Sequence, residues 1–538
     1  MTAPPLVSAR TRLGLGILAV ALGVGVLSDQ LLRAWPWGVN VLLCTVAFLG
    51  GALWLVRRHR LPTTPDAAWL ALTALLCAVA FVRRDSDALR LLDLMALLSA
   101  LALAALGTQG LSLRNRGVTT YALSLLHAFA TACLGGLFLV GRDIRWREVP
   151  RPARLGRLRS IAVGVALAVP LLAIFGALFA SADTTFDAAA SRLFHFDPGR
   201  LAGHAFMIGL WSALAGGLLW GALVNRMPAL TVGERAVSPG LSFTTAATTL
   251  GLLNLLFVVF LALQVAYLFG GAAYVAHTTG LTLAQYARRG FFEMAAAAGL
   301  ALPVVLGAEW ATAPQTPAER TSFRALLSLT VLLVAVMLVS AMQRMWLYVD
   351  AFGLTELRLY TTAFMVLLAG VFAWFAWTVL RGQRPRFAFG ALVQSWVVLA
   401  GLHVLNPDAF IARVNLQRAV AGRAIEEPNV EGEPKDTSMV LLSVTPSRPE
   451  PDVRYLAWDL SADAVPELLT ALPSLSPENQ RVVSEALLHR WAEGGTLADA
   501  RGTDWRSWNW SEGRARRLAR TRRADLITML PSWQRRAW

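Results

Sequence analysis

Residues 359–380 read LYTTAFMVLLAGVFAWFAWTVL, a stretch without one charged side chain. A helix needs roughly 20 apolar residues to cross the hydrocarbon of a bilayer, so this segment by itself predicts a membrane-spanning helix. Similar uncharged runs occur at residues 34–56, 117–141, 160–182 and 387–407. Their repetition predicts an all-α, polytopic integral membrane bundle followed by a small helical extramembrane domain.

Composition agrees, because 56% of the residues are hydrophobic and only 15% are charged. The net charge of +15 is unevenly distributed, since residues 407–538 carry 18 basic and 18 acidic side chains and the excess lies entirely in residues 1–406. Arginines in short loops between apolar runs set the orientation of the spans and meet lipid headgroups. The charge therefore predicts a lipid environment and no binding of nucleic acid.

Residue types that carry chemistry are sparse. Cys44, Cys77 and Cys133 lie inside apolar runs, which predicts neither disulfides nor a thiolate metal site. Phosphate-binding loops, zinc-binding HExxH and nucleophile elbows do not occur in the sequence. Carboxylate pairs such as Asp85 and Asp87 fall in loops, where solvation is the expected state. We expect no enzymatic activity and no cofactor.

The apolar runs predict about twelve spans. They are expected near residues 13–32, 35–56, 66–82, 90–109, 118–141, 160–181, 201–224, 241–271, 291–310, 324–347, 359–380 and 387–405. The region from 236 to 287 is uncharged throughout, and one long helix ending near Gly270 fits it best. The expected organisation is an N-terminal transmembrane region with a basic loop, a core transmembrane region, an interfacial helix, a disordered linker and a helical domain, at residues 1–159, 160–405, 406–423, 424–452 and 453–538.

Arginine bias predicts sidedness, but the two halves of the chain disagree. One alternating set of loops carries 14 arginines and the other only 5. The rich set comprises residues 142–159, 225–237, 311–324 and 381–386, and the poor set comprises residues 182–200, 272–290 and 349–358. The rich set is expected in the cytoplasm, which places the tail outside. Basic residues near Arg10 and Arg57 would then lie on the wrong side, and a miscounted span among the first five would reconcile both halves.

Ionisable and amide groups at membrane depth are costly and need a partner or a purpose. They are Asp93, His127, Asp183, His204, Asn254, Gln264, Glu293, Gln343, Arg344 and His403. Two interpretations stay open for them. They could line a polar pathway for an ion or small solute, or they could bond across packed helices, with arginines and acids at the helix ends extending toward the interface.

Several segments resemble a known family. They are residues 181–186 (SADTTF), 286–293 (YARRGFFE), 344–348 (RMWLY), 353–358 (GLTELR), 406–413 (NPDAFIAR) with Asn415, 455–456 (YL), 460–466 (LSADAVP) and 504–509 (DWRSWN). In this order they resemble the bacterial multi-pass membrane family of domain of unknown function 4153/4173, over about residues 160–520. The resemblance implies a location in the bacterial inner membrane and implies no reaction.

The same segments supply the candidate functional or structural polar residues. These are Asp183, Arg288, Arg289, Glu293, Arg344, Tyr348, Asp350, Arg358, Asn406, Asp408, Arg413, Asn415 and Asp463. The spacing of Arg289 and Glu293 allows an ion pair on one helix. A charge network around the turn at Gly353 would tie two helix ends together, and a substrate-binding ring is the alternative. The Asn406 turn allows Asp408 to cap a following helix, which is expected at the interface.

The tail is expected to fold as three helices. One covers residues 463–472, and the next begins after Ser476 and places Val483, Leu487 and Trp491 on one face. The third, near residues 511–530, carries six arginines that could contact lipid phosphates or an acidic partner. The sequence thus favours a non-enzymatic role in sensing, interaction or assembly, with a possible protein partner at the tail. A small-solute or ion transporter is the alternative.

Overall fold

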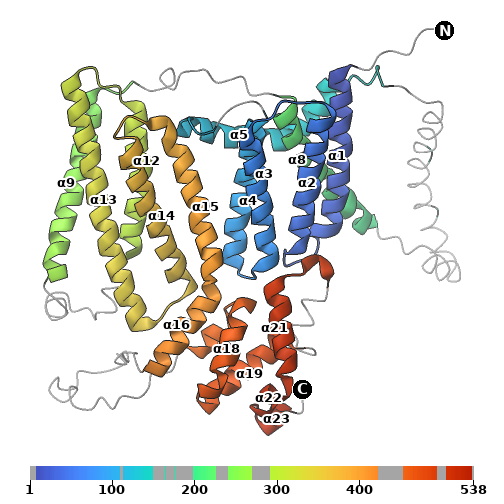
Figure 1. Ribbon diagram of the computed structural model, residues 1–538, viewed down its shortest axis with the longest axis vertical. Helices are drawn as coiled ribbons and strands as arrows, with labels where there is room; N and C mark the ends of the chain where they lie inside the picture. Colours follow the sequence, from blue (N-terminus) through green and yellow to red (C-terminus); the bar gives the residue numbers. More distant parts are fainter. Residues whose placement is uncertain are drawn as a thin grey trace.

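The computed structural model describes residues 8–108, 113–149, 198–225, 240–269, 291–421, 452–492 and 504–535, together with Gly164 and Phe175. These described residues form helices and turns, and the fold is all-α. Figure 1 shows a bundle of long helices, with a cluster of short helices at one end that is formed by the C-terminal part of the chain.

Within the described residues, eleven helices are long and apolar enough to cross a membrane. They are α1 (Ala9–Leu32), α2 (Val39–Arg58), α3 (Pro65–Arg83), α4 (Asp87–Gly107), α5 (Val118–Phe138), α8 (Pro198–Leu223), α9 (Phe243–Phe269), α12 (Phe291–Ala311), α13 (Pro317–Phe352), α14 (Glu356–Thr378) and α15 (Phe387–Leu405). The expected span at residues 160–181 lies outside the described residues except for Gly164 and Phe175. The protein is therefore a multi-pass membrane protein.

The ends of the longest helix, α13, follow from local chemistry. Thr316 and Glu319 form a capping box at its start, and Pro317 occupies the first turn, where its missing N–H costs nothing. The helix stops at Gly353, whose φ of +78° is readily adopted only by glycine. The prediction of one long helix before Gly270 is confirmed by α9.

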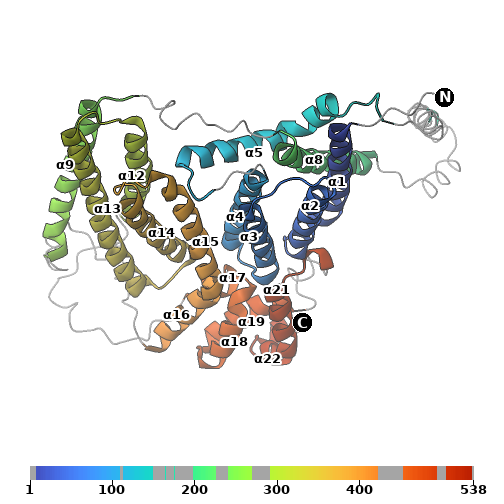
Figure 2. The same ribbon diagram turned by 45° about the horizontal axis from the view of Figure 1, so that its top comes forward.

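The long helices pack as two groups. Helices α9, α12, α13 and α14 enclose one apolar core, and α1, α2 and α8 enclose a second. Helix α15 lies between the groups in both views (Figures 1 and 2). Its residues Phe389 and Trp396 contact Trp69 of α3 edge to face, with ring centroids 5.9 and 5.7 Å apart. Aromatic contact thus joins α15 to α3, which packs beside α2.

The two ends of the bundle differ in charge. We call the end that the C-terminal helices contact the tail end, and the opposite end the arginine end. The turns between α2 and α3, between α12 and α13 and between α14 and α15 all lie at the arginine end. The arginines there are Arg10, Arg12, Arg57, Arg58, Arg60, Arg114, Arg116, Arg142, Arg145, Arg147, Arg320, Arg324, Arg381, Arg384 and Arg386.

Helix α5 has the length and composition of a span, yet both of its ends lie at the arginine end. Near its start, Tyr121 donates to the carbonyl of Leu113, whose N–H is bound by Asp66 at the beginning of α3. Beyond its end, Asp143 pairs with Arg10 at the beginning of α1, at 2.5 Å. Both views show α5 lying across the other helices (Figures 1 and 2).

The course of α5 resolves the conflict between the arginine-rich loops. Because α5 returns to the arginine end, the N-terminus and residues 142–149 lie on the same side, and Ser8 donates its N–H to Glu148 at 3.1 Å. The start of α8 lies at the tail end, where His204 contacts Asp29 near the end of α1. The arginines near Arg10, Arg57 and Arg145 therefore lie at the same end of the bundle as those of the later arginine-rich turns.

Small residues permit α5 to approach α8 closely. A Cβ added at Gly135 of α5 would lie 2.8 Å from the backbone oxygen of Gly217 of α8. A Cβ at Gly221, one turn further along α8, would meet the side chain of Thr131. The Gly217 and Gly221 pair is thus a real contact face between two helices, as such spacings permit in membranes.

Exposed tryptophans gather at both ends of the bundle. Trp54, Trp146, Trp310 and Trp377 lie at the arginine end, and Trp35, Trp346, Trp505, Trp508 and Trp510 lie at the tail end. Indole rings favour the headgroup region because one edge is polar and the body is apolar. The two levels agree with a membrane between the ends, as the apolar spans require.

The tail domain comprises α16 (Pro407–Ala421), α17 (Val453–Trp458), α18 (Val465–Ala471), α19 (Pro477–Trp491), α21 (Trp510–Thr521), α22 (Arg523–Thr528) and α23 (Ser532–Arg535). Ser476 caps α19, and Val483, Leu487 and Trp491 are buried, as expected. The third expected helix is instead two helices, α21 and α22, which meet at Arg522. The expected interfacial helix is α16, and its buried face contributes Ile411 to the core of the tail domain.

Candidate functional site

Five segments meet where the tail domain joins the bundle, and we call this place the junction. They are the α3–α4 turn (residues 84–90), the first turn of α14 (356–360), the α15–α16 turn (406–408), the segment before α18 (459–463) and the start of α21 (509–511). Their side chains supply several buried charges, and each charge needs a partner because burial without one is costly.

Asp463 is the central acceptor of the junction. Its Oδ1 accepts from Arg84 at 2.9 Å and from the Ser511 hydroxyl at 2.7 Å. With its amide oriented to satisfy both neighbours, Asn406 donates to Asp463 Oδ1 at 3.2 Å and accepts from Arg84 at 2.8 Å. The Asp463 side chain is 2% exposed and that of Arg84 is 12% exposed. This is a buried ion pair between the tail domain and the bundle.

Asp85 and Asp463 each accept a backbone N–H from the other's segment. The N–H of Asp85 donates to Asp463 Oδ2 at 3.0 Å, and the N–H of Ala462, beside Asp463, donates to Asp85 Oδ2 at 3.1 Å. Arg90 neutralises Asp85 at 2.6 Å. The expectation that Asp85 is solvated is wrong, because residues far along the chain cover it, whereas the Asp87 side chain is 88% exposed as expected.

Asp408 and Glu356 form a second acidic pair. Asp408 is fully buried, and its Oδ2 accepts from the N–H of Ser461 at 3.1 Å. Its Oδ1 has no hydrogen-bond donor among the described residues. The side chains of Asp408 and Glu356 interact with each other. The N–H of Glu356 donates to the Tyr455 hydroxyl of the tail domain at 3.0 Å. Two adjacent buried carboxyls share one proton more readily than they both ionise.

Burial raises the pKa of Asp408 above its ordinary value of 3.8, and the negative charge of Asp463 raises it further. The folded protein therefore binds this proton more tightly than the unfolded chain does. The resulting contribution to stability is present in acid and is lost as the pH rises from about 4 through the folded pKa of Asp408. The junction should loosen as the solution becomes more alkaline.

The junction also contacts the interior of the bundle. Arg84 donates to the carbonyl of His403 in α15 at 2.7 Å. The ring of His403 bonds to Asp93 of α4 at 2.8 Å, and Asp93 is 1% exposed. Asn509 of the tail domain donates to the carbonyls of Phe81 and Arg84, at 2.8 and 2.6 Å. A displacement of the tail domain at the junction would therefore act directly on α3, α4 and α15.

The α13–α14 turn is held by a separate group of expected residues. Arg358 donates to the carbonyls of Phe352 and Gly353, and its guanidinium lies 4.0 Å from the centre of the Tyr348 ring. Asn415 of α16 accepts from the N–H of Leu354 at 2.8 Å and donates to its carbonyl at 2.7 Å. Arg358 therefore binds carbonyls of the Gly353 turn rather than the acidic side chain of the expected charge network.

The remaining expected residues lie elsewhere. Arg344 is buried in α13, and Glu293 is exposed in the first turn of α12. The backbone carbonyl of Asp350 accepts from Arg418 of α16. Expected residues outside the described residues are Asp183, Arg288 and Arg289.

Amides inside the bundle behave as packing contacts. Asn254 of α9 accepts from Thr330 of α13 at 2.8 Å and donates to the carbonyl of Leu326 at 3.1 Å. Gln264 of α9 accepts from Ser340 of α13 at 2.9 Å. These groups are satisfied between two neighbouring helices, which supports the packing interpretation for both.

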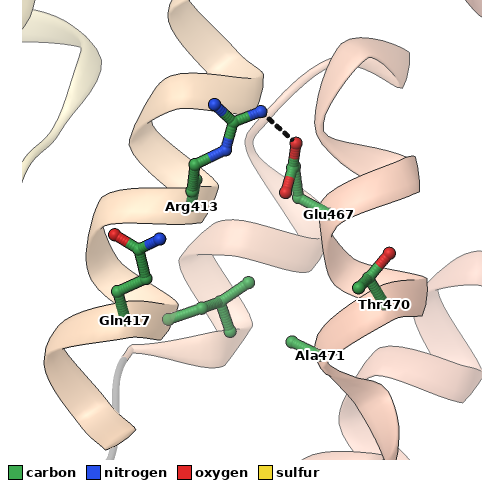
Figure 3. Close-up of a pocket in the computed structure, with 6 residues that line it drawn as sticks. Arg413, Gln417, Glu467, Thr470 and Ala471 are labelled. Carbon is green, nitrogen blue, oxygen red and sulfur yellow. Dashed lines mark hydrogen bonds and ion pairs between the residues drawn. The ribbon is translucent and has the colours of Figure 1, made fainter. Parts of the chain in front are cut away.

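A cleft of about 290 Å³ opens between α16 and α18. It is lined by Arg413, Leu416, Gln417, Glu467, Thr470 and Ala471. Figure 3 shows the Arg413 guanidinium reaching across to Glu467, at 2.6 Å. Ligand pockets typically measure about 300–1,000 Å³, so this cleft lies just below their range. Arg413 therefore joins two helices of the tail domain at its surface.

Sequence reasoning missed Arg84, Asp85, Arg90, Glu356 and Tyr455 as partners of the expected Asp408 and Asp463. Tyr455 lies in a segment that had carried the family resemblance, which was the one available signal. Among the described residues, no three His, Cys, Asp or Glu side chains are arranged to hold a metal ion. The junction is an arrangement of buried charges that joins two parts of the chain.

One family model matches residues 70–471, and its description is domain of unknown function (DUF4153). The matched range runs from α3 to the end of α18, so it includes the bundle side of the junction and Asp463. Curated proteins and solved structures give no match to the chain.

Proposed function

Because the chain belongs to the DUF4153 family, whose description assigns no activity, we propose a function from the geometry of the junction. The protein is a non-enzymatic membrane protein for sensing or assembly, in which the tail domain binds a protein partner and the junction passes the event to the bundle. The observation that carries this proposal is the reciprocal bonding of Asp85 and Asp463, which joins the tail domain to the α3–α4 turn.

The energetics of the junction favour mechanical coupling. Removing one member of a buried ion pair typically costs 3–5 kcal/mol, because the other charge is left buried without compensation. Exposed pairs are worth about 0–1 kcal/mol. A partner that displaced the tail domain would have to supply the cost of the buried pair, about 3–5 kcal/mol. Binding of a partner at the tail domain and a movement of α3 and α4 would therefore be energetically linked.

Orientation follows from the arginine end. Cationic loops remain in the cytoplasm, so we place the arginine end there and the tail domain on the outer side of a bacterial inner membrane. In that position the tail domain meets partners outside the cytoplasm. Arg514 and Arg517 on α21 are exposed and offer a basic surface to an acidic partner.

The test is in vivo photo-crosslinking from a crosslinking amino acid placed at Arg514 in the full chain. A specific protein adduct is expected at this position, and deletion of residues 424–538 should abolish the phenotype of the gene. A milder variant, Arg84→Gln, keeps the tail domain and breaks its ion pair. The proposal fails if the adduct is retained in Arg84→Gln but the phenotype does not change.

A second candidate function is transport of a proton or small ion. The observation that favours it is the Asp93–His403 pair, which is buried between α4 and α15, with Nδ1 of His403 lacking a hydrogen-bond partner among the described residues. Ionisable pairs at such depth often mark an ion path. Asp93→Asn would then abolish a flux in vesicles while the protein stays folded, and Glu293 or Arg344 would be the next positions to neutralise.

A further inference from the structure

A cleft of about 400 Å³ lies on the outer face of α2, at the arginine end. It is lined by Gly50, Leu53, Trp54, Arg57 and Arg58. The volume falls in the range of ligand sites, about 300–1,000 Å³. The cleft is therefore large enough for a headgroup and the first carbons of a lipid chain.

The cleft faces away from the protein core. The adjoining face of α2 packs on α1, where a Cβ added at Gly51 would meet Val20. In contrast, a Cβ added at Gly50 would meet nothing within 4 Å, and the side chains of Leu53 and Trp54 are 48% and 53% exposed. Along a span, this exposed apolar surface is where an acyl chain lies.

Cations close the end of the cleft. Arg57 and Arg58 occupy the last turn of α2, and neither forms an ion pair or a side-chain hydrogen bond with a described residue. Burial lowers the pKa of His59, and the charges of Arg58 and Arg12 lower it further, which shows that this corner is electropositive. A phosphate group with one negative charge would supply the partner that these guanidiniums lack.

Acidic side chains nearby are already engaged. Glu148 accepts from Ser8, Thr11 and Arg145, each within 3.2 Å. Asp143 binds Arg10 and the indole of Trp220. The arginines of the cleft therefore meet no competing carboxylate from the α1 start or the α5 end.

We propose that this cleft binds an anionic phospholipid, with Arg57 and Arg58 on its phosphate and an acyl chain along Gly50 and Leu53. Trp54 lies between the two, at the level where indole rings meet headgroups. The ligand is a phosphodiester that comes from the leaflet at the arginine end. Basic clefts at the cytoplasmic side of spans bind such headgroups.

The test is native mass spectrometry of the full-length protein in detergent, titrated with phosphatidylglycerol. A first, saturable lipid adduct is expected. Each arginine near an anionic headgroup contributes about fivefold in affinity, so Arg57→Gln with Arg58→Gln should weaken this adduct about 30-fold. Gly50→Leu fills the apolar part of the cleft without a clash and should also weaken it, while keeping both charges.

The matched control is Arg114→Gln with Arg116→Gln, which removes two charges from the same end but leaves the cleft intact. It should leave the first adduct unchanged. Equal weakening by this control, or no weakening by either cleft variant, would overturn the proposal. In a second experiment, inorganic phosphate competes with the bound lipid. If phosphate displaces the lipid at equal phosphorus concentration, the assignment of the site to a lipid is wrong.

Discussion

Breaking the Asp463 ion pair should release the tail domain from the bundle. The perturbation is Asp463→Ala, which leaves Arg84 without its carboxylate and leaves the N–H of Asp85 without its acceptor. The Asp463 side chain is 2% exposed, so the cost is that of a buried pair, about 3–5 kcal/mol. That cost corresponds to a loss of roughly 10²- to 4 × 10³-fold in the affinity of the tail for the bundle.

The assay is tail retention after a single cut. A protease recognition sequence is inserted after Asp436 in the full chain, so that after cleavage only noncovalent contacts hold the C-terminal fragment. The cleaved, unsubstituted protein should keep its fragment through gel filtration, and the Asp463→Ala protein should lose it at the same concentration. Arg84→Gln tests the same pair from the bundle side and leaves the tail sequence unchanged.

The control for this prediction is Glu467→Ala. It also removes a carboxylate near the start of α18, but its pair with Arg413 is largely exposed, with the Arg413 side chain 54% exposed. Such pairs contribute about 0–1 kcal/mol, so retention should hardly change. Equal release by Asp463→Ala and Glu467→Ala would refute the reasoning, because the buried charge would then have no special weight.

Three further predictions address the proton, the helix packing and the orientation. Tail retention in the unsubstituted protein should fall as the pH rises above about 4, because folding raises the pKa of Asp408. When retention is measured across pH, Asp408→Asn should remove this pH dependence. Gly135→Val should lower the melting temperature in detergent, because its Cβ would lie 2.8 Å from a backbone oxygen of α8 and overpacking costs about 1–3 kcal/mol. The control Gly141→Val places its Cβ in open space and should leave the melting temperature unchanged. A periplasm-active phosphatase fused after Trp538 should be active, and a cytoplasm-only fluorescent protein fused after Arg147 should fluoresce; the reverse pattern would contradict the orientation.

The fold followed from sequence wherever the signal was local. The single long helix α9 could be predicted because its uncharged length is a property of neighbouring residues. The course of α5 could not, because its length and apolarity are those of any span. Its direction is set by contacts with residues far along the chain, such as the bond from Leu113 to Asp66.

In the candidate site, too, local sequence signals predicted some residues and long-range contacts hid others. Asp408 and Asp463 were candidates because a turn signature and a family resemblance marked their segments. Asp85 was assigned to solvent because its loop is short and polar, and nothing near it in sequence reveals the partner that covers it. That partner, Asp463, is separated from Asp85 by 378 residues. Burial of a loop charge by so distant a segment leaves no periodic or compositional trace.

The residues of the junction lie far apart in the sequence, so they are synthesised at different times. The α3–α4 hairpin enters the membrane early in synthesis, with Asp85 at its tip, but the segment that satisfies Asp85 is made near the end of the chain. Until then the hairpin tip must keep its charges in water, and α3 lacks the Asn509 cap on its last carbonyls. A nascent chain that stalls before residue 509 therefore presents an unfinished polar tip, and a complete chain hides it.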